Sequence, residues 1–162
     1  MSHVPAFDLS PPSPLQFDEL ATHLTGEERQ VLLHHGTESP FCGVLLSEKR
    51  PGVYCCRLCG LPLFQGGSKF DSRTGWPSFT APFDDQHLQY VRDASYGMVR
   101  TEIRCARCGS HQGHVFDDGP PPSHQRYCIN SVSLQFVANG EELPDRLQRG
   151  APEGQPLIGV SP

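Results

Sequence analysis

Residues Tyr127–Phe136 read YCINSVSLQF, and this stretch indicates most directly how the chain folds. Its second half places apolar residues at alternate positions, namely Val132, Leu134 and Phe136. Such alternation is typical of a strand with one face in the core. Cys128 and Asn130 continue this row, and two steps along a strand separate them by about 6.6 Å on the same side. The pattern predicts a strand whose core-facing row ends in a thiol and an amide.

A second strand is predicted over residues 99–105, where VRTEIRC alternates again. One face carries Val99, Thr101, Ile103 and Cys105, and the other carries Arg100, Glu102 and Arg104. Glycine and proline number 16 each among 162 residues, which suits short strands joined by turns and argues against a helical bundle. The chain after Gly36 is therefore expected to form antiparallel sheet.

The segment before these strands is predicted to be helical from Phe17 to His35. Thr25 precedes Glu28 by three residues, which is the signature of a capping box at a helix start. Gly36 has the position of a C-cap after the last apolar residues.

Length and composition limit how the chain can be organised and which partners it can have. One domain of modest core is assigned to residues 17–142, between a proline-rich flexible arm (1–16) and a mostly irregular tail (143–162). The net charge of -5 argues against nucleic acid as a partner, and no apolar run approaches the ~20 residues that a membrane span requires. The first residues lack the pattern of a signal peptide, so a cytoplasmic location is expected. Cytoplasmic thiols stay reduced, which favours metal ligation or catalysis over structural disulfides for the seven cysteines.

Four of the cysteines occur in two near copies of one motif, CRLCG at 56–60 and CARCG at 105–109. Each copy places two sulfurs on a tight turn, and the trailing glycine lets the chain fold back. Together they provide the ligands of a tetrahedral structural zinc ion, namely Cys56, Cys59, Cys105 and Cys108. Two redox dithiols or buried free thiols are the alternatives, although no βαβ unit surrounds either pair as in a thioredoxin-type site. A closed four-sulfur site has no open position, so its role is in folding.

Cys128 stands apart from these pairs, and its simplest interpretation is a small buried hydrophobic residue. Two neighbours favour a chemical role. Arg126 shares its strand face and can favour the thiolate by Coulomb attraction. Asn130 is a polar group on an apolar row and needs a hydrogen-bonding partner, such as a substrate.

Two histidines lie just upstream, in a segment that can pair with the strand of Cys128. His111 and His114 are three residues apart, so a regular strand points them to opposite faces. Both histidines serve one site only if Gly113 interrupts the strand.

Several separate motifs resemble those of the B-type methionine sulfoxide reductases. In chain order they are TESPFCG (37–43), CRLCG, KFDSRTGWPSF (69–79), CARCG, GHVFDDGP (113–120) and RYCINS (126–131). The resemblance covers roughly residues 17–140. It implies a mainly β fold, with two antiparallel sheets in a barrel-like core, short N-terminal helices and zinc-linked knuckles. It also implies reduction of the R epimer of methionine sulfoxide, protein-bound or free, since each sulfoxide epimer has its own enzyme.

The chemistry of such a reaction agrees with the residues near Cys128. A thiolate attacks the sulfoxide sulfur, which requires an accessible cysteine of low pKa, and Cys128 beside Arg126 fits this description. His111 or His114 can supply a proton to the departing oxygen near neutral pH. Cys128 is then left as a sulfenic acid.

The resemblance also assigns residues to substrate binding. It makes Trp76 the wall against which the S-methyl group packs, although a core position in the GWPSF turn is the alternative. Phe116 is placed beside the substrate, and Asn130 and Asp118 match positions that order water and the histidines. An Asp-Asp-Gly turn, however, needs no function to explain Asp118.

A second thiol can condense with the sulfenic acid to give a disulfide. Many relatives carry this resolving cysteine just before GWPSF, where the present chain has Thr74. The spare thiols are Cys42 and Cys55, of which Cys55 adjoins the zinc ligand Cys56 and is expected to be buried. Cys42 lies in the loop SPFCGVLL, where movement costs less. We therefore predict a Cys42–Cys128 disulfide that a thioredoxin-type donor reduces, in preference to direct reduction by an external thiol.

Two other classes compete with this prediction. A non-enzymatic zinc-ribbon-like module would hold a protein partner with the same sheets, and Cys128 and Trp76 would then be core residues. Another thiol oxidoreductase, such as a peroxidase, leaves Trp76 beside two histidines unexplained. The enzyme is expected to act as a monomer.

Overall fold

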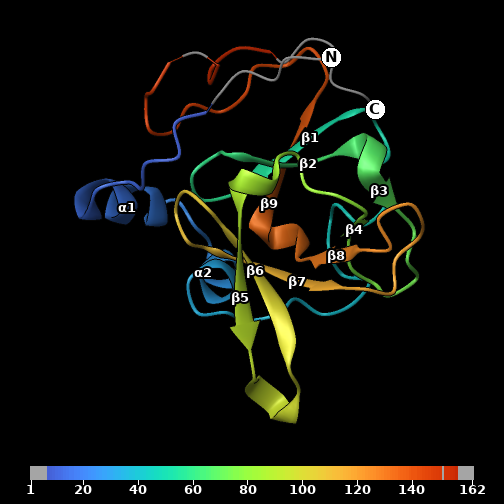
Figure 1. Cartoon of the computed structure of the whole chain (residues 1–162). Helices are drawn as coiled ribbons and strands as arrows, with labels where there is room; N and C mark the ends of the chain where they lie inside the picture. The colour runs from blue at the N-terminus through green and yellow to red at the C-terminus, as the bar shows by residue number, and fades with distance from the viewer. Residues whose placement is uncertain (1–6, 151, 157–162) are drawn as a thin grey trace.

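The computed structural model describes residues 7–150 and 152–156, and they form two antiparallel sheets preceded by two short helices (Figure 1). The smaller sheet contains β1 (Gly52–Cys56), β2 (Pro62–Gln65) and β9 (Leu134–Ala138), in the order β2-β1-β9. The larger sheet contains β3 (Lys69–Phe70), β4 (Ser78–Phe79), β5 (Leu88–Asp93), β6 (Arg100–Cys105), β7 (His111–Phe116) and β8 (Arg126–Ile129), in the order β3-β4-β8-β7-β6-β5. The mainly β prediction with two antiparallel sheets is confirmed, although neither sheet closes into a barrel.

The predicted helical segment forms two helices, α1 (Pro14–Ala21) and α2 (Gly26–Leu32). The capping box predicted at Thr25 is confirmed, because its side chain accepts from the N–H of Glu28 and the Glu28 carboxylate accepts in return. Thr25 has an extended backbone, so a new helix begins here and the predicted single helix is interrupted.

The C-terminal end of α2 differs from the predicted glycine cap. His35 adopts the left-handed conformation, with φ 59°, while Gly36 donates its N–H to the carbonyl oxygen of Gln30 at 3.0 Å. The left-handed residue turns the chain, and the His35 side chain reaches Glu102 on β6.

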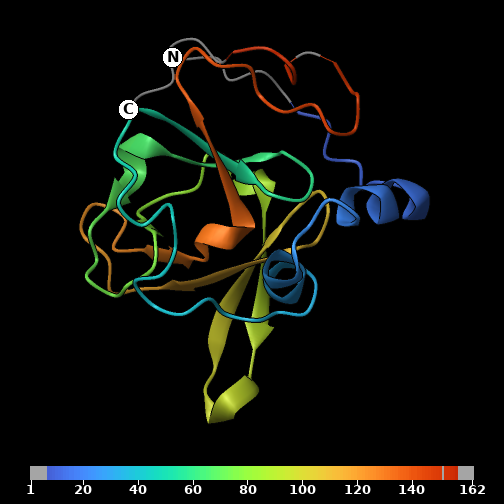
Figure 2. The ribbon, with the colours of Figure 1, turned by 180° about the vertical axis from the view of Figure 1, so that it is seen from behind.

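The stretch 127–136 contains two strands rather than the single predicted one. β8 ends at Ile129 in the larger sheet, and β9 begins at Leu134 in the smaller sheet. Between them lies a 3-10 turn, η4 (Ser131–Ser133), which Figure 2 shows as the orange helical turn from which β9 departs. The continuous row from Cys128 to Phe136 was therefore wrong, because the turn ends one alternation and starts another. This turn also carries the chain from one sheet to the other.

Strand β6 confirms the prediction over 99–105, apart from Val99, which precedes it and is exposed. Its charged face, however, does not look into solvent. Glu102 is only 5% exposed and lies among polar side chains of neighbouring elements.

The three remaining 3-10 turns of the described chain are η1 (Gly66–Ser68), η2 (Asp85–His87) and η3 (Ser95–Gly97).

Both ends of the described chain pack on the core. Phe7 is buried and lies edge-on to Phe83, with ring centroids 6.1 Å apart. Leu143 and Leu147 are buried as well, although residues 139–150 and 152–156 form neither helix nor strand. The arm before residue 7 and the tail after residue 156 lie outside the described residues, and the domain boundaries stay a prediction. Within the described ranges, no helix combines the length and apolarity needed to cross a membrane.

Candidate active site

A cavity of about 220 Å³ opens over the larger sheet around Cys128. Six of the catalytic and substrate-binding residues predicted from the sequence line it: Trp76, His114, Phe116, Arg126, Cys128 and Asn130. A larger hollow of about 500 Å³ lies on another side of Trp76, but its lining contains neither a thiol nor an imidazole. Of these two hollows, the smaller is therefore the one whose residues can carry out thiol chemistry.

The strand register brings the thiol and one imidazole together. Cys128 on β8 pairs directly with His114 on β7, and it pairs with Ser78 on β4 at its other side. Directly opposed residues of an antiparallel pair have Cβ atoms about 4.5–5.5 Å apart and share a face. His114 is thus positioned beside the thiol by backbone pairing rather than by a flexible loop.

His111 joins His114 on the same side because β7 contains a bulge. Its pairing with β6 shifts by one residue at Gln112, and the two imidazole centroids lie 5.6 Å apart. The interruption of the strand that was expected at Gly113 therefore occurs at the preceding residue, Gln112. Gly113 has a separate role, since a Cβ atom there would lie 2.0 Å from the carbonyl oxygen of Cys128.

Each histidine is held by a different carboxylate. His114 Nε2 lies 2.8 Å from Asp93 Oδ2. His111 Nδ1 lies 2.6 Å from Glu102 Oε2, which also lies 2.8 Å from His35 Nδ1. Neither carboxylate was identified from the sequence. The alternation of β6 placed Glu102 only on the charged face of the strand, and Asp93 ends β5 without any motif.

The two histidines differ in access to the cavity. His111 is 2% exposed and is absent from the cavity lining, whereas His114 lines it. Burial lowers the pKa of His111, and the hydrogen bond from its ring to Glu102 opposes that effect only in part. Of the two candidates, His114 is the one placed to exchange a proton with a bound molecule.

The electrostatic setting of Cys128 differs from the expected one. Burial raises the pKa of the Cys128 thiol, and the charge of Arg126 together with hydrogen bonds to Thr74 and Arg126 opposes this without outweighing it. Desolvation disfavours the thiolate, so the net direction is opposite to that expected from Arg126 alone. A thiolate at Cys128 therefore requires a further favourable interaction.

Arg126 is engaged by its own neighbours. Its Nε and Nη2 atoms donate to the two carboxylate oxygens of Asp118 at 2.9 and 3.2 Å. Its guanidinium also lies over the ring of Phe116, at 4.5 Å from the centroid. Asp118 thus holds the arginine at the rim of the cavity and, among the described contacts, pairs with Arg126 rather than with a histidine.

Asn130 finds its hydrogen-bonding partners inside the fold. Its Oδ1 accepts from the N–H of Glu38 at 3.0 Å, and its Nδ2 donates to the carbonyl oxygen of Gln112 at 3.0 Å. It therefore does not depend on a substrate for a partner, and instead ties the 37–39 loop to the bulge of β7. The indole Nε1 of Trp76 donates to the carbonyl oxygen of Glu38 at 3.0 Å, which fixes the half-buried ring along the cavity.

The two spare thiols occupy contrasting positions. Cys55 is fully buried on β1, and burial raises the pKa of its thiol. Cys42 is exposed in the turn after Phe41 and does not line the cavity. Its loop is nevertheless tied to the cavity wall, because Phe41 donates its N–H to the carbonyl oxygen of Gly75 at 2.7 Å, next to Trp76.

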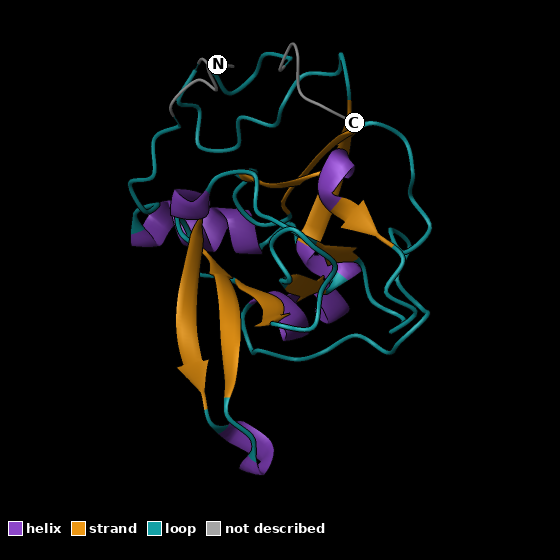
Figure 3. Cartoon of the chain, turned by 45° about the vertical axis from the view of Figure 1, so that its right-hand side comes forward, coloured by secondary structure: helices purple, strands orange, loops and turns teal. Residues whose placement is uncertain are grey.

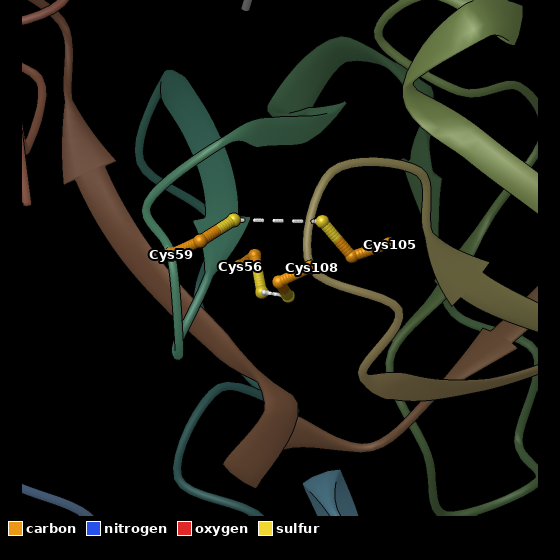
Figure 4. A group of neighbouring side chains, drawn as sticks. All are labelled: Cys56, Cys59, Cys105 and Cys108. Atoms are coloured by element: carbon orange, nitrogen blue, oxygen red, sulfur yellow. Dashed lines mark hydrogen bonds between the residues drawn. The ribbon is translucent and has the colours of Figure 1, made fainter. Parts of the chain in front are cut away.

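The four paired cysteines converge as predicted, from two separate segments of the chain (Figure 4). Cys56 Sγ lies 3.6 Å from Cys108 Sγ, and Cys59 Sγ lies 3.5 Å from Cys105 Sγ. All four sulfurs lie within 4.8 Å of one another. A tetrahedral zinc ion with bonds of about 2.3 Å requires sulfur separations of about 3.8 Å, so the cluster fits this ion.

The same cluster is tied to the ends of the chain through Arg107, which is 1% exposed. Its guanidinium donates to the Sγ and carbonyl oxygen of Cys59, to the Glu153 carboxylate at 2.7 Å and to the carbonyl oxygen of Asp8 at 3.3 Å. When the four cysteines bind a metal ion as thiolates, this buried cation would offset part of their negative charge.

Comparison with known proteins accounts for this arrangement. The model of the SelR domain matches residues 24–138. Peptide methionine sulfoxide reductase MsrB of Caulobacter vibrioides (strain NA1000 / CB15N) is 67% identical over 144 residues, which are 89% of this chain and 91% of that protein. The proteins of the same name from Xylella fastidiosa (strain M23) and Escherichia coli (strain K12 / DH10B) are 58% and 50% identical, over 89% and 78% of this chain and 93% of each relative.

The fold, taken with these relatives, defines an oxidoreductase. The chain belongs to the SelR-domain family of peptide methionine sulfoxide reductases of the MsrB type. The resemblance found in the sequence is confirmed. Membership of this family argues against the two competing classes, a non-enzymatic binding module and a peroxidase.

Proposed function

We propose that this enzyme reduces the R epimer of methionine sulfoxide, protein-bound or free, with Cys128 as the nucleophile. The observation that carries the proposal is the direct pairing of Cys128 with His114 in a cavity walled by Trp76. A half-buried tryptophan offers an apolar surface for the S-methyl group, while the thiol and the imidazole face the polar sulfoxide. The choice of epimer rests on the sequence motifs shared with the B-type enzymes, since each epimer has its own reductase.

The first step transfers one oxygen atom and two electrons. Cys128 sulfur attacks the sulfoxide sulfur, the sulfur–oxygen bond breaks, and the oxygen ends on Cys128 as a sulfenic acid. The methionine sulfur is reduced by two electrons and the cysteine sulfur is oxidised by two. The proton of the thiol ends on the transferred oxygen, so the overall step needs no external acid.

His114 is the residue that we assign to this proton transfer. It lies opposite the thiol and lines the cavity, and its Nε2 is held by Asp93, which leaves Nδ1 as the other nitrogen for exchange. Because burial raises the pKa of Cys128, the thiolate forms as the proton moves toward the bound sulfoxide, with Arg126 stabilising the negative sulfur. His111 acts behind it as part of the hydrogen-bonded cluster with Glu102.

The second step resolves the sulfenic acid. Cys42 supplies the thiol, a Cys42–Cys128 disulfide forms, and one water molecule leaves. A thioredoxin-type dithiol then donates two electrons and restores both thiols. Exposure of Cys42 and the short link from its loop to Gly75 support this choice over Cys55, which is buried within the smaller sheet. The loop 40–45 has to move for the two sulfurs to meet.

A single zinc ion is proposed for the four-cysteine cluster, held by Cys56, Cys59, Cys105 and Cys108. Zinc bound by four thiolates stabilises the fold and takes no part in the redox step. We further propose that the enzyme is a cytoplasmic monomer.

The function is tested by supplying each resolved epimer of N-acetylmethionine sulfoxide with dithiothreitol as the reductant. Methionine formation from the R epimer, with the S epimer left nearly unchanged, is the expected result. Turnover of the S epimer alone would overturn the proposal.

A further inference from the structure

The hairpin of β5 and β6 projects from the larger sheet (Figures 1 and 3). Its end carries exposed apolar side chains. We define the hairpin tip as residues 95–99. Tyr96 is 87% exposed, Val99 is 67% exposed and Met98 is 50% exposed. Three large apolar side chains within four positions contribute little to the core, so the fold alone does not explain them.

The backbone of the tip makes the tyrosine more unusual. Tyr96 has φ 56° and ψ 28°, Gly97 has φ 70°, and Met98 donates its N–H to the carbonyl oxygen of Ser95 at 3.1 Å. Residues 95–98 thus form a tight turn whose two central residues are both left-handed, a conformation for which Asn, Asp or Gly is preferred at the first position. A bulky residue with positive φ is an outlier that raises the question of function.

Arg100, the residue that follows the tip, connects it to the cavity. The guanidinium of Arg100 lies 6.0 Å from the centroid of the Tyr96 ring, and Arg100 also lines the cavity. Arg100 Nη2 lies 3.3 Å from Asp93 Oδ2, the oxygen that holds His114. One arginine therefore joins the exposed tyrosine to the residues beside Cys128.

We infer that the hairpin tip binds the polypeptide that flanks the methionine sulfoxide, and that it favours segments with apolar residues beside the oxidised methionine. The inference rests on the proposed function. A cavity of about 220 Å³ holds one side chain, so the neighbouring residues of a protein substrate must run along its rim. An extended chain advances about 3.3 Å per residue, which brings residues a few positions away onto a projecting surface next to the cavity. Tyr96, Met98 and Val99 offer these residues apolar contact.

The experiment compares two substrates with dithiothreitol as the reductant. One is the R epimer of N-acetylmethionine sulfoxide amide, and the other is a peptide with the same epimer between leucine and phenylalanine residues. Tyr96→Asn suits the left-handed turn, so the variant should fold, as thermal unfolding would verify. We expect its kcat/KM for the peptide to fall by about tenfold, as for loss of one aromatic contact, with kcat/KM for the small substrate unchanged. Met98→Ser combined with Val99→Thr should act in the same direction.

Leu15→Ser on α1 is the matched control, because Leu15 is 70% exposed and belongs to an element away from the hairpin (Figure 1). It should leave both substrates unaffected. Equal losses on both substrates in Tyr96→Asn, or no loss on the peptide, would overturn the inference. The same assays are repeated with thioredoxin in place of dithiothreitol. If Tyr96→Asn loses activity only with thioredoxin, the tip contacts the electron donor, and the inference is overturned as well. Wild-type enzyme inactive on both substrates would instead refute the proposed function.

Discussion

His114 and Cys128 lie directly opposite each other on neighbouring antiparallel strands, β7 and β8. This pairing fixes the imidazole beside the thiol with the rigidity of a sheet, and Asp93 fixes the other end of the ring. His111, only three residues away, is turned to the same side by the bulge at Gln112 but is buried behind its neighbour. The two histidines are therefore expected to contribute unequally to the reaction.

Replacement of His114 should cost far more activity than replacement of His111. We expect His114→Asn to lower kcat by about 10²–10⁴-fold, the usual contribution of a positioned acid or base. His111→Asn should show a smaller loss, because His111 does not reach the cavity and acts on it only through its surroundings. Single-turnover rates with the R epimer provide the comparison, and a larger loss in His111→Asn would reverse our assignment.

Glu102 should make the fold sensitive to acid. Burial tends to raise the pKa of this carboxyl, but hydrogen bonds from Arg104, His111 and His35 outweigh it and hold the pKa at about 2. A carboxyl whose pKa is depressed on folding stabilises the protein above its unfolded value of about 4.3, and that stability is lost as the pH falls toward 2. Glu102→Gln should lower the free energy of unfolding at pH 7 by about 2 kcal/mol and should flatten its dependence on pH between about 4.3 and 2.

Urea unfolding at a series of pH values would measure this effect. Glu19→Gln is a suitable control, since Glu19 is exposed on α1. An unchanged pH profile in Glu102→Gln would show that the cluster with His35 and His111 does not stabilise the fold.

Several parts of this fold follow from local sequence patterns. The alternation over 99–105, the capping box at Thr25 and the two CxxCG motifs each depend on residues close in sequence, and each was predicted correctly. The 3-10 turn at Ser131–Ser133 was not predicted, because the apolar alternation runs through it without a break. Its stability comes from distant groups, such as the hydrogen bond from Ser133 Oγ to the carbonyl oxygen of His111.

The candidate site likewise contains residues that the sequence identifies and residues that depend on the tertiary structure. Cys128, His114 and Trp76 were identified from their residue types and from family motifs. The carboxylates that hold the histidines were not, since Glu102 stood only as one member of a charged strand face and Asp93 carried no local signal. Pairing between strands brings both carboxylates to the imidazoles, and strand pairing is a property of the tertiary structure.

The zinc proposal predicts that Cys108→Ser loses the metal and unfolds at a lower temperature. Metal binding at such a site is coupled to folding, so loss of one ligand should remove much of the stability. Elemental analysis of the purified protein should give one zinc per chain for the wild type. Cys55→Ser, which alters a buried thiol outside the cluster, should retain the zinc even if it costs stability. Wild-type protein that is folded but contains no zinc would exclude the site.

The resolving role of Cys42 predicts a specific cross-link. After treatment with substrate and no reductant, peptide mapping should detect Cys42 joined to Cys128. Cys42→Ser should retain activity with dithiothreitol, which attacks the sulfenic acid directly, and should lose most activity with thioredoxin. A Cys55–Cys128 peptide, or full thioredoxin activity in Cys42→Ser, would show that another route resolves the sulfenic acid.

The central claim is that Cys128 takes the oxygen atom from the sulfoxide, and a single turnover without reductant tests it most directly. Cys42→Ser protein mixed with an excess of the R epimer should release one methionine per chain, and intact-mass analysis should show one added oxygen that tandem fragmentation assigns to Cys128. The double variant Cys42→Ser/Cys128→Ser, folded as judged by its thermal unfolding, should release no methionine. Stoichiometric release by the double variant, or an added oxygen located on any other residue, would contradict the account.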